Sequence, residues 1–370
     1  MLQVLPALDT GGVEQGTVEI AQALAREGWG ALVASAGGRL VPALQAVGGR
    51  HLALPLGAKD PVGIVRNAGK LARLVRAEGV ALIHARSRAP AWSALLAARR
   101  AGLPFVTTYH GVYGESVPGK RRYNSVMARG DRVIAASRYV AELIASRHGT
   151  DPARIRLIRR GVDPARFDPG INRGVQLARL ASAWRLPDGA PIVMLPARLT
   201  RWKGGLVLIE ALARLARQDV VAVLVGADQG RAGFAAELER LARALGVADR
   251  VRLAGHCADM PAALMLADAV VSASTEPEAF GRAVIEAQAM ARPVIATNHG
   301  GAAETVEDGE TGLLVPPGDA AALAAALDRV LAMSPEGRFA LGTRARFAVR
   351  ARYTTAAMQA ATLDVYRELL

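Results

Sequence analysis

The sequence lacks the features that define several large classes of protein. Its 370 residues contain a single cysteine, Cys257, which excludes a disulfide framework and a cluster of thiolate metal ligands. Its longest apolar runs, 191–197 and 220–226, are far shorter than the roughly 20 residues that cross a membrane as a helix. The first residues have no basic segment of the kind that opens a signal peptide, so we expect a cytoplasmic protein.

Acidic residues are scarce in the first half of the chain. Residues 1–170 have a net charge of +12, whereas residues 171–370 contribute only +1 to the total of +13. This asymmetry favours a polyanionic partner, either nucleic acid or an anionic membrane surface, although arginines on solvated faces would give the same count. The sequence has neither the aromatic and basic strands of RNA-binding sheets nor a zinc-ligand spacing. We therefore expect the partner to be the anionic inner face of the cytoplasmic membrane, and we expect no nucleic-acid partner.

The length and pattern of the chain predict two α/β domains. Apolar residues make up 51% of the sequence, and 370 residues exceed what one hydrophobic core usually serves. Short β-branched runs alternate with helical stretches throughout, which is typical of parallel sheets covered by helices. The predicted strands are 2–8, 31–35, 51–55, 80–85, 104–109, 132–136 and 156–159, then 192–197, 220–226, 250–255, 269–273, 293–296 and 312–315. They predict two doubly wound, Rossmann-like sheets that face a central cleft.

The domain boundaries follow from composition. We expect a first domain over 1–168, a second over 169–354, and a last helix, 355–370, that crosses back to the first domain. The stretch 164–190 is interpreted as the connection because it contains prolines, glycines and aspartates and no clear strand. Ligands of open α/β sheets bind beyond the carboxyl ends of the strands, so residues directly after strands are the candidates for a site.

Two cations follow the strand predicted at 192–197. Arg198 and Lys203 lie five positions apart on a glycine-containing turn, an arrangement that suits a diphosphate. Cleavage of a glycosyl phosphate builds negative charge on the leaving nucleotide, which a metal or fixed cations must neutralise. No Asp-x-Asp pair occurs, so the usual carboxylate route to a divalent metal is missing and we expect no metal and no cofactor. The alternative is a pair of surface charges at a helix start, where the helix dipole disfavours cations.

Two acidic residues follow a later strand. Glu278 lies in the loop and Glu286 about one turn into the next helix, so both can accept hydrogen bonds from hydroxyls in one cleft. The backbone amides near Phe280 and Gly281 open that helix and predict an anion site. The alternative interpretation is structural: Glu286 pairs with Arg282, and Glu278 caps the helix.

Together these residues resemble the motifs of glycosyltransferase family 4, which has the GT-B fold. The resemblance covers nearly the whole chain, because its motifs occur in order from the first strand to the last third. They are Gly11-Gly12, His110-Gly111, Ile158-Arg-Arg-Gly-Val-Asp163, the pair Arg198 and Lys203, the pair Glu278 and Glu286, and Asn298-His-Gly-Gly301. The sequence of residues 276–282 is similar to that of bacterial enzymes of lipopolysaccharide and surface-polysaccharide assembly.

The resemblance implies a role for each candidate residue. Glu278 would hold hydroxyls of the transferred sugar, and Glu286 would hold the nucleotide ribose. Arg198 and Lys203 would hold the diphosphate. His110 would lie over the sugar ring near the reacting carbon.

Backbone segments would complete the site that the resemblance implies. Gly11 and Gly12 would let the backbone approach phosphate or acceptor. The amides of Phe280 and Gly281 would contact phosphate and sugar. The segment around His256 and Cys257 would border the base.

The sequence is therefore interpreted as a retaining, metal-independent glycosyltransferase. The donor would be a nucleoside-diphosphate sugar, uridine-linked in preference to guanosine-linked, and the acceptor a lipid-linked or envelope saccharide. Two alternatives stay open: a sugar-nucleotide epimerase of the same fold, and a basic nucleic-acid-binding module, which would leave the paired glutamates unexplained. One departure from the family pattern is Arg160, which replaces the usual Asn before Gly-Val-Asp.

Overall fold

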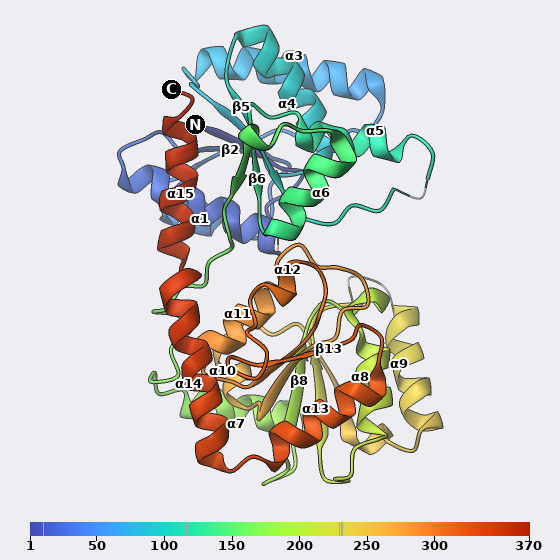
Figure 1. Cartoon of the computed structure of the whole chain (residues 1–370). Helices are drawn as coiled ribbons and strands as arrows, with labels where there is room; N and C mark the ends of the chain where they lie inside the picture. The colour runs from blue at the N-terminus through green and yellow to red at the C-terminus, as the bar shows by residue number, and fades with distance from the viewer. Residues whose placement is uncertain (10, 116, 229, 231) are drawn as a thin grey trace. The chain divides into compact units, whose positions relative to one another are not determined.

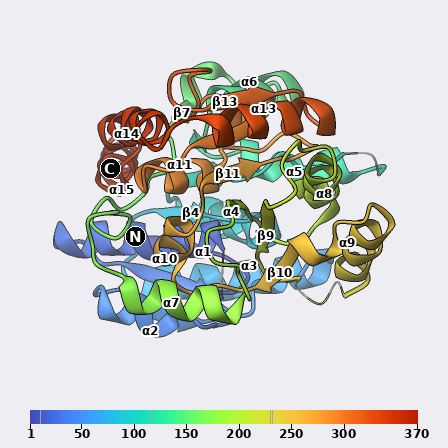
Figure 2. The same cartoon turned by 90° about the horizontal axis from the view of Figure 1, so that it is seen from below.

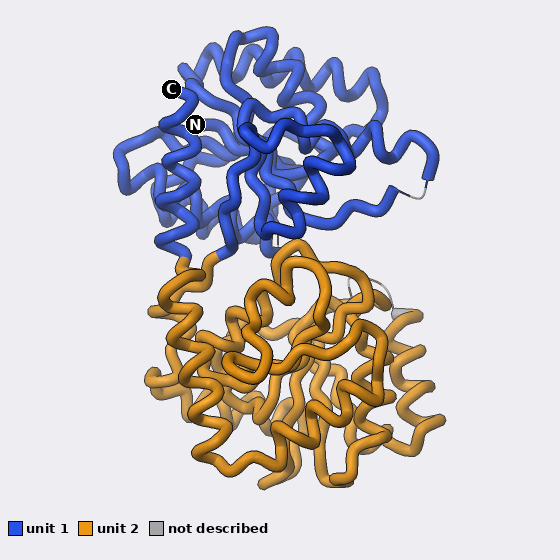
Figure 3. Tube along the Cα trace, in the orientation of Figure 1, with its two compact units in different colours: residues 1–160, 355–370 blue, residues 161–354 orange. Residues whose placement is uncertain are grey.

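The computed structural model comprises two compact units, and it describes residues 1–370 except 10, 116, 229 and 231. Figure 3 shows the division: one unit is Met1–Arg160 with Thr355–Leu370, and the other is Gly161–Thr354. The first unit ends before the predicted boundary at 168. The stretch interpreted as a connection, 164–190, belongs to the second unit, where it includes helix α7 (Gly174–Ala183) packed on helix α10 (Met260–Met265).

The first unit contains a seven-stranded parallel sheet in the order β3-β2-β1-β4-β5-β6-β7. Its strands are β1 (Leu2–Val4), β2 (Leu32–Ser35), β3 (Arg50–Ala53), β4 (Ile83–Ala85), β5 (Phe105–Tyr109), β6 (Arg132–Ala135) and β7 (Ile155–Leu157). The strand order reverses between β1 and β4, which pair directly with Gln3 opposite His84. At such a reversal two neighbouring connections leave on opposite faces of the sheet, so a crevice opens at the carboxyl ends of β1 and β4.

Helices cover both faces of this sheet. They are α1 (Gly12–Arg26), α2 (Val41–Ala46), α3 (Pro61–Ala77), α4 (Arg88–Ala101), α5 (Lys120–Asn124), α6 (Arg138–His148) and α15 (Thr355–Arg367). Buried side chains of α1, α2 and α15 form one core with the sheet, and α3 and α4 pack against each other (Figure 1). Local signals set the helix starts: the carboxylate of Asp60 accepts a hydrogen bond from Gly63 N before α3, and Ser137 caps α6 in the same way.

The second unit contains a six-stranded parallel sheet in the order β10-β9-β8-β11-β12-β13. Its strands are β8 (Ile192–Pro196), β9 (Val221–Val225), β10 (Val251–Gly255), β11 (Ala269–Ser272), β12 (Val294–Thr297) and β13 (Leu313–Val315). Its remaining helices are α8 (Gly205–Leu212), α9 (Ala232–Ala244), α11 (Arg282–Ala289), α12 (Gly300–Ala303), α13 (Ala320–Ala332) and α14 (Pro335–Arg352). Helices α8, α9 and α13 lie on one side of the sheet and α10 and α11 on the other (Figures 1 and 2). Here the order reverses between β8 and β11.

Every strand that the sequence predicts overlaps an observed strand, and the ends differ for physical reasons. The first strand stops at Val4 instead of continuing to residue 8. Pro6 has no backbone N–H to donate to a ladder, so the pairing ends there although Leu5 and Leu8 stay buried. Among the described residues, no helix combines the length and the apolar character that a membrane span requires.

Candidate functional site

The predicted site residues lie after strands, at the carboxyl edges of the two sheets. Arg198 and Lys203 follow β8, and Glu278 follows β11, so they flank the point where the strand order of the second sheet reverses. Gly12 follows β1 and His110 follows β5 in the first sheet. Each unit therefore has candidate residues at the carboxyl edge of its own sheet.

The second unit brings Lys203 and Glu278 into direct contact. The Lys203 Nζ atom lies 2.7 Å from Glu278 Oε2, and their side chains are only 16% and 12% exposed. Lys203 is the last residue of a single 3-10 turn, Arg201–Lys203. Gly204 caps this turn with a left-handed conformation, φ 76°. A Cβ atom on Gly204 would lie 1.8 Å from the carbonyl oxygen of Ala273, so only glycine lets this turn pack against the end of β11. This close approach places the lysine beside the glutamate.

Two serines on and after β11 also hold Glu278. The hydroxyl of Ser274 donates a hydrogen bond to Glu278 Oε1, and the hydroxyl of Ser272 lies 3.4 Å from the same atom. Burial alone would raise the pKa of Glu278, but the charge and hydrogen bond of Lys203, with the two hydroxyls, lower that pKa overall. The carboxylate is therefore ionised at neutral pH. Sequence reasoning missed both serines, which lie two positions apart at the last residue of β11 and just after it; that spacing of two was the signal that could have identified them.

The glycine-rich segment 298–301 supports the backbone of Glu278. Gly301 N donates to the Glu278 carbonyl oxygen at 2.7 Å, and the Gly300 backbone forms a bridge with Glu278. The ring of His299 hydrogen-bonds through Nε2 to the Ser274 carbonyl oxygen at 2.8 Å. These contacts hold the 274–278 loop in place, and they give His299 a structural role in that loop.

Glu286 lies in the second turn of α11. Its Oε1 accepts a hydrogen bond from Arg282 Nε at 2.9 Å, so the predicted alternative of an i,i+4 ion pair is present. Gly281 forms the N-cap of α11 with φ of 80°, and a Cβ there would lie 2.7 Å from the Ala302 side chain. The Phe280 side chain is buried and packs edge-on against Tyr353. Only its backbone is thus left to meet a ligand.

The other predicted residues of the second unit are more exposed. Arg198 is exposed and, in the described part of the chain, its side chain makes no hydrogen bond or ion pair. Between Arg198 and Lys203, the buried Thr200 hydroxyl has no hydrogen-bond partner in the part of the chain that the structure describes. His256 is exposed and Cys257 is half-buried after β10, an edge strand that β9 separates from β8. Burial raises the pKa of the Cys257 thiol.

In the first unit, His110 is held by Arg160. The Nη2 atom of Arg160 donates a hydrogen bond to His110 Nδ1. Burial, and then the charges of Arg160 and Arg86, hold the pKa of His110 well below its ordinary value of 6.5. His110 is therefore neutral at physiological pH. Arg160 is the residue that departs from the family pattern, and its contact gives that departure a structural role.

A second histidine, His84, is fully engaged in packing. It is 1% exposed; its Nδ1 lies 2.6 Å from the Tyr366 hydroxyl, and its Nε2 lies 2.7 Å from the Thr108 hydroxyl. These bonds join β4 and β5 to α15. The neighbouring Arg86, which sequence reasoning missed, is 2% exposed and follows β4 directly. Its place immediately after a strand at the order reversal was the signal that could have identified it.

Gly11 and Gly12 are exposed at the start of α1. Gly11 is the N-cap, and no side chain of a described residue caps the helix there. The first amides of a helix have no partner within the helix, so these amides can meet a ligand.

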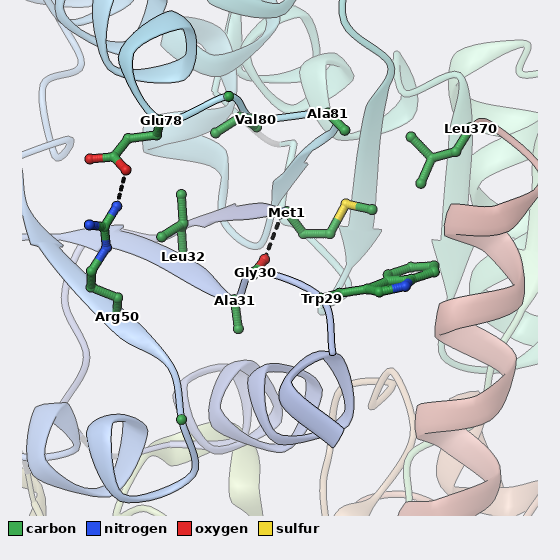
Figure 4. A pocket seen from close by; sticks show the side chains of 12 residues that line it. Met1, Trp29, Gly30, Ala31, Leu32, Arg50, Glu78, Val80, Ala81 and Leu370 are labelled. Carbon is green, nitrogen blue, oxygen red and sulfur yellow. Dashed lines mark hydrogen bonds and ion pairs between the residues drawn. The ribbon is translucent and has the colours of Figure 1, made fainter. Parts of the chain in front are cut away.

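A pocket of about 610 Å³ opens at the opposite edge of the first sheet (Figure 4). Most of its lining residues lie at or just before the amino ends of β1 to β4, including Met1, Trp29 and the ion pair of Arg50 with Glu78, and Leu370 after α15 also lines it. None of the predicted site residues lines it. Among the described residues, no three His, Cys, Asp or Glu side chains are grouped as a metal would require.

Two family models match the chain. One, described as Glycosyltransferase Family 4, matches residues 10–166, and the other, Glycosyl transferases group 1, matches 179–352. The D-inositol 3-phosphate glycosyltransferase of Nocardiopsis dassonvillei is 30% identical over 357 residues, which cover 88% of this chain and 82% of that protein. The chain belongs to glycosyltransferase family 4. It spans little more than half of the first curated relatives it matches, 54% to 58% of three further D-inositol 3-phosphate glycosyltransferases.

Solved structures of glycosyltransferases share the fold of this family 4 chain. A glycosyltransferase from Rickettsia africae is 36% identical with a TM-score of 0.91, and the match covers 100% of this chain and 97% of that one. HepE from Anabaena, solved with UDP and glucose, is 25% identical with a TM-score of 0.86 and coverage of 100% and 99%. The two Rossmann-like units are those of the GT-B fold, as the sequence predicts.

Proposed function

We propose that the protein is a retaining, metal-independent hexosyltransferase that moves a sugar from a nucleoside-diphosphate sugar to a saccharide or glycolipid. The observation that carries the proposal is the contact between Lys203 and Glu278 at the order reversal of the second sheet. A cation for phosphate and a carboxylate for sugar hydroxyls lie side by side there. A nucleotide sugar presents phosphate and sugar hydroxyls close together, and these are the groups that the cation and the carboxylate can bind.

The donor would bind to the second unit, and the neighbours support a uridine nucleotide. HepE, a structure of the same fold, binds UDP and glucose. In this chain Arg198 and Lys203 would contact the diphosphate, Glu278 the transferred sugar and Glu286 the ribose. The amides of Phe280 and Gly281 would contact phosphate, and the backbone near His256 and Cys257 would border the base.

The bond to be broken joins the anomeric carbon to the diphosphate oxygen. As it breaks, negative charge develops on that oxygen, and the fixed positive charges of Lys203 and Arg198 stabilise it without reorganisation. The acceptor hydroxyl attacks from the same face, forms the new carbon–oxygen bond and gives its proton to the departing phosphate oxygen. This sequence retains the anomeric configuration, and the two cations take the place of a divalent metal.

The acceptor would bind to the first unit. The curated relatives carry the name D-inositol 3-phosphate glycosyltransferase, so their acceptor is a polyol phosphate. The basic first half of this chain likewise favours a negatively charged acceptor. A lipid-linked or envelope saccharide that carries phosphate satisfies that requirement. His110 would lie near the reacting carbon, and Gly11 with Gly12 would let the backbone approach phosphate.

A peripheral position on the inner face of the cytoplasmic membrane completes the proposal. Helix α3 presents two basic side chains, Arg66 and Arg73, and two apolar ones, Val62 and Val65, which are 77% and 51% exposed. Val65 and Arg66 follow Val62 by three and four residues, and Arg73 follows Arg66 by seven, about two turns, so the four lie on one face of the helix. Basic residues attract anionic headgroups, and exposed valines can enter the interface, so an anionic bilayer is the partner that fits this face.

The test is a screen of nucleotide sugars against the purified protein. Saturation with the correct donor at about 100 times its Kd should raise the free energy of unfolding by about 2.7 kcal/mol. Slow hydrolysis of that donor should yield the free sugar and the nucleoside diphosphate. Interconversion of the intact nucleotide sugar without hydrolysis would identify an epimerase instead. Binding of no nucleotide sugar at all would overturn the proposal.

A further inference from the structure

Helix α14 packs on the second unit with one face and carries two exposed phenylalanines on another. Its inner face lies against α11, and the buried residues of α14 are Leu341, Gly342, Ala345 and Val349 (Figures 1 and 2). On its outer side, Phe339 is 70% exposed and Phe347 is 78% exposed. Exposed apolar groups that are surrounded by polar residues mark interaction sites, so this outer face indicates a partner.

The outer face of α14 is arranged symmetrically about Thr343. An α-helix turns by about 100° per residue, so Phe339 and Phe347 lie about 40° to either side of Thr343, about one turn before and after it. Glu336 and Arg350 lie two turns before and after Thr343, within about 20° of its direction. All five of these residues are exposed. Each half of the face therefore carries one phenylalanine and one charged residue, and the two charges are opposite.

This arrangement makes the face complementary to a second copy of itself. A two-fold axis through Thr343, perpendicular to the helix, brings a second α14 alongside the first in the opposite direction. Phe339 then faces Phe347 of the partner subunit, and Glu336 faces Arg350 of the partner subunit. In a two-fold contact both chains use the same patch, so each of these pairs forms twice.

A pocket beside Phe347 offers space for the phenylalanine of a second chain. The pocket has a volume of about 570 Å³ and lies between the second half of α14 and residues 307–311. On the helix it is lined by Phe347, Ala348 and Ala351 among others. The same two-fold axis brings Phe339 of the partner subunit to this half of α14. Each chain thus has both an exposed aromatic ring and an apolar pocket at matching positions.

The charges around this face favour a second copy of the chain over an anionic membrane. The exposed charged residues of α14 and of the pocket lining are three glutamates and three arginines, namely Glu307, Glu310, Glu336, Arg344, Arg350 and Arg352. Their charges cancel, and two arginines already pair with glutamates, Arg344 with Glu310 and Arg352 with Glu307. An anionic surface attracts a net positive patch, whereas a self-complementary contact needs both signs.

We propose that the protein forms a symmetric dimer through α14, with the two helices antiparallel and Phe339 of each chain seated beside Phe347 of the partner subunit. One helix and one pocket make a small interface, so we expect monomer and dimer to exchange at micromolar concentrations. The dimer does not depend on the proposed function, because none of these residues belongs to the proposed donor site. Its disruption should therefore leave the affinity for UDP unchanged.

Sedimentation equilibrium of the full chain at micromolar concentrations measures the Kd of the dimer. Phe347→Glu removes an apolar contact and adds a buried charge at two places in the interface, so it should raise this Kd at least about tenfold. Val175→Glu is the matched control, because Val175 is an 82% exposed residue of α7 in the same unit and should leave the Kd unchanged. A wild type that stays monomeric, or a dimer that Phe347→Glu leaves intact, would overturn the proposal.

An exchange of charges tests the antiparallel register. Glu336→Arg and Arg350→Glu should each weaken the dimer several-fold, because each brings like charges together at both ends of the interface. The variant with both changes should recover most of the wild-type affinity, since opposite charges face each other again. A double variant as weak as the single variants would overturn the pairing about Thr343.

A covalent cross-link tests the axis without weakening the interface. Thr343→Cys, made together with Cys257→Ser, places a single thiol at the axis, where it should face the same thiol of the partner subunit and form a disulfide-linked dimer on mild oxidation. Val175→Cys with Cys257→Ser should stay monomeric under the same conditions. Failure of Thr343→Cys to cross-link faster than Val175→Cys would overturn the axis. Binding of a monomeric wild type to acidic vesicles, lost in Phe347→Glu, would assign the face to a membrane and overturn the dimer.

Discussion

The sheet edges of the two units satisfy their charged side chains in different ways. In the second unit two buried or half-buried cations are paired: Lys203 contacts Glu278, and Arg282 contacts Glu286. In the first unit the buried Nε and Nη2 atoms of Arg86 and Nε2 of His110 have no hydrogen-bond partner among the described residues. A ligand of the second unit must replace internal ion pairs with its own contacts. A ligand of the first unit can bind donors that the described residues leave without a hydrogen bond. Substitutions at the two sheet edges should therefore have different effects on catalysis, ligand binding and stability.

The largest effect is expected from Lys203→Ala. This change removes the cation that would stabilise the leaving diphosphate and leaves Glu278 without its ion-pair partner, so we expect kcat to fall by about 10²- to 10³-fold. Release of nucleoside diphosphate in an initial-rate assay measures it. Arg201→Ala is the matched control, because Arg201 lies on the same turn but pairs with Glu237 and is 67% exposed. Equal losses in both variants would argue against a specific role for Lys203.

A charge reversal in the first unit should give the next largest effect, on membrane binding. Lys120, Arg121 and Arg122 lie together in α5, and each basic residue near an anionic surface contributes about 1 kcal/mol, so changing all three to Glu should weaken vesicle binding by about two orders of magnitude. Sedimentation with vesicles containing acidic lipid measures this. The same change at three exposed arginines of the second unit, Arg214, Arg240 and Arg243, should have little effect. Binding that ignores acidic lipid and salt would contradict the docking model.

The two glutamates of the second unit should separate in a binding experiment. Glu286→Ala should weaken binding of free UDP by about 10- to 100-fold, since a hydrogen bond to a charged group is worth about 1.5–3 kcal/mol. Glu278→Ala should leave UDP affinity nearly unchanged but weaken binding of the UDP-sugar. Calorimetry with both ligands distinguishes these outcomes. Equal losses of UDP affinity in the two variants would refute the assignment of ribose to one residue and sugar to the other.

The pH dependence of stability should differ between the units. The pKa of His110 and that of His84 are lowered from 6.5, so the unfolded chain binds protons that the folded first unit excludes, and stability falls as the pH drops below about 6.5. The lowered pKa of Glu278 acts later: its contribution is present above its ordinary pKa of 4.5 and is lost below it. Urea unfolding between about pH 7.5 and 5 measures the first effect. His110→Gln should flatten the curve, and His256→Gln, at an exposed site, should not.

The smallest effect is expected from chelation. The proposed transition state relies on Arg198 and Lys203, so excess chelator should change the rate of sugar transfer by less than about twofold. The rate before and after addition of EDTA, and again after excess Mg²⁺, measures this. A complete loss that Mg²⁺ restores would show that the leaving group needs a metal.

Much of the fold could be predicted because its signals are local. Each buried strand is a short β-branched run bounded by helical periodicity, and a few neighbouring residues suffice to produce that pattern. The order of the motifs along the chain identified the family for the same reason, because Gly11-Gly12, Lys203 and Glu278 each lie in the loop or turn that follows a strand. The ends of the elements were less predictable, since pairing partners decide them. That helix α7 in the stretch 164–190 packs on α10 is not visible in the composition of the stretch, because it depends on contacts distant in the chain.

What the sequence by itself determined is which residue types follow which strands, because strand and turn propensities act over a few positions. It therefore placed Lys203 and Glu278 at one sheet edge, 75 residues apart in the chain. Only the tertiary structure decided that Gly204 brings them to 2.7 Å, that Ser274 holds the same carboxylate, and that the buried Nε and Nη2 atoms of Arg86 have no hydrogen-bond partner among the described residues. These outcomes depend on strand order and side-chain packing across the sheet, and no local pattern in the chain records them.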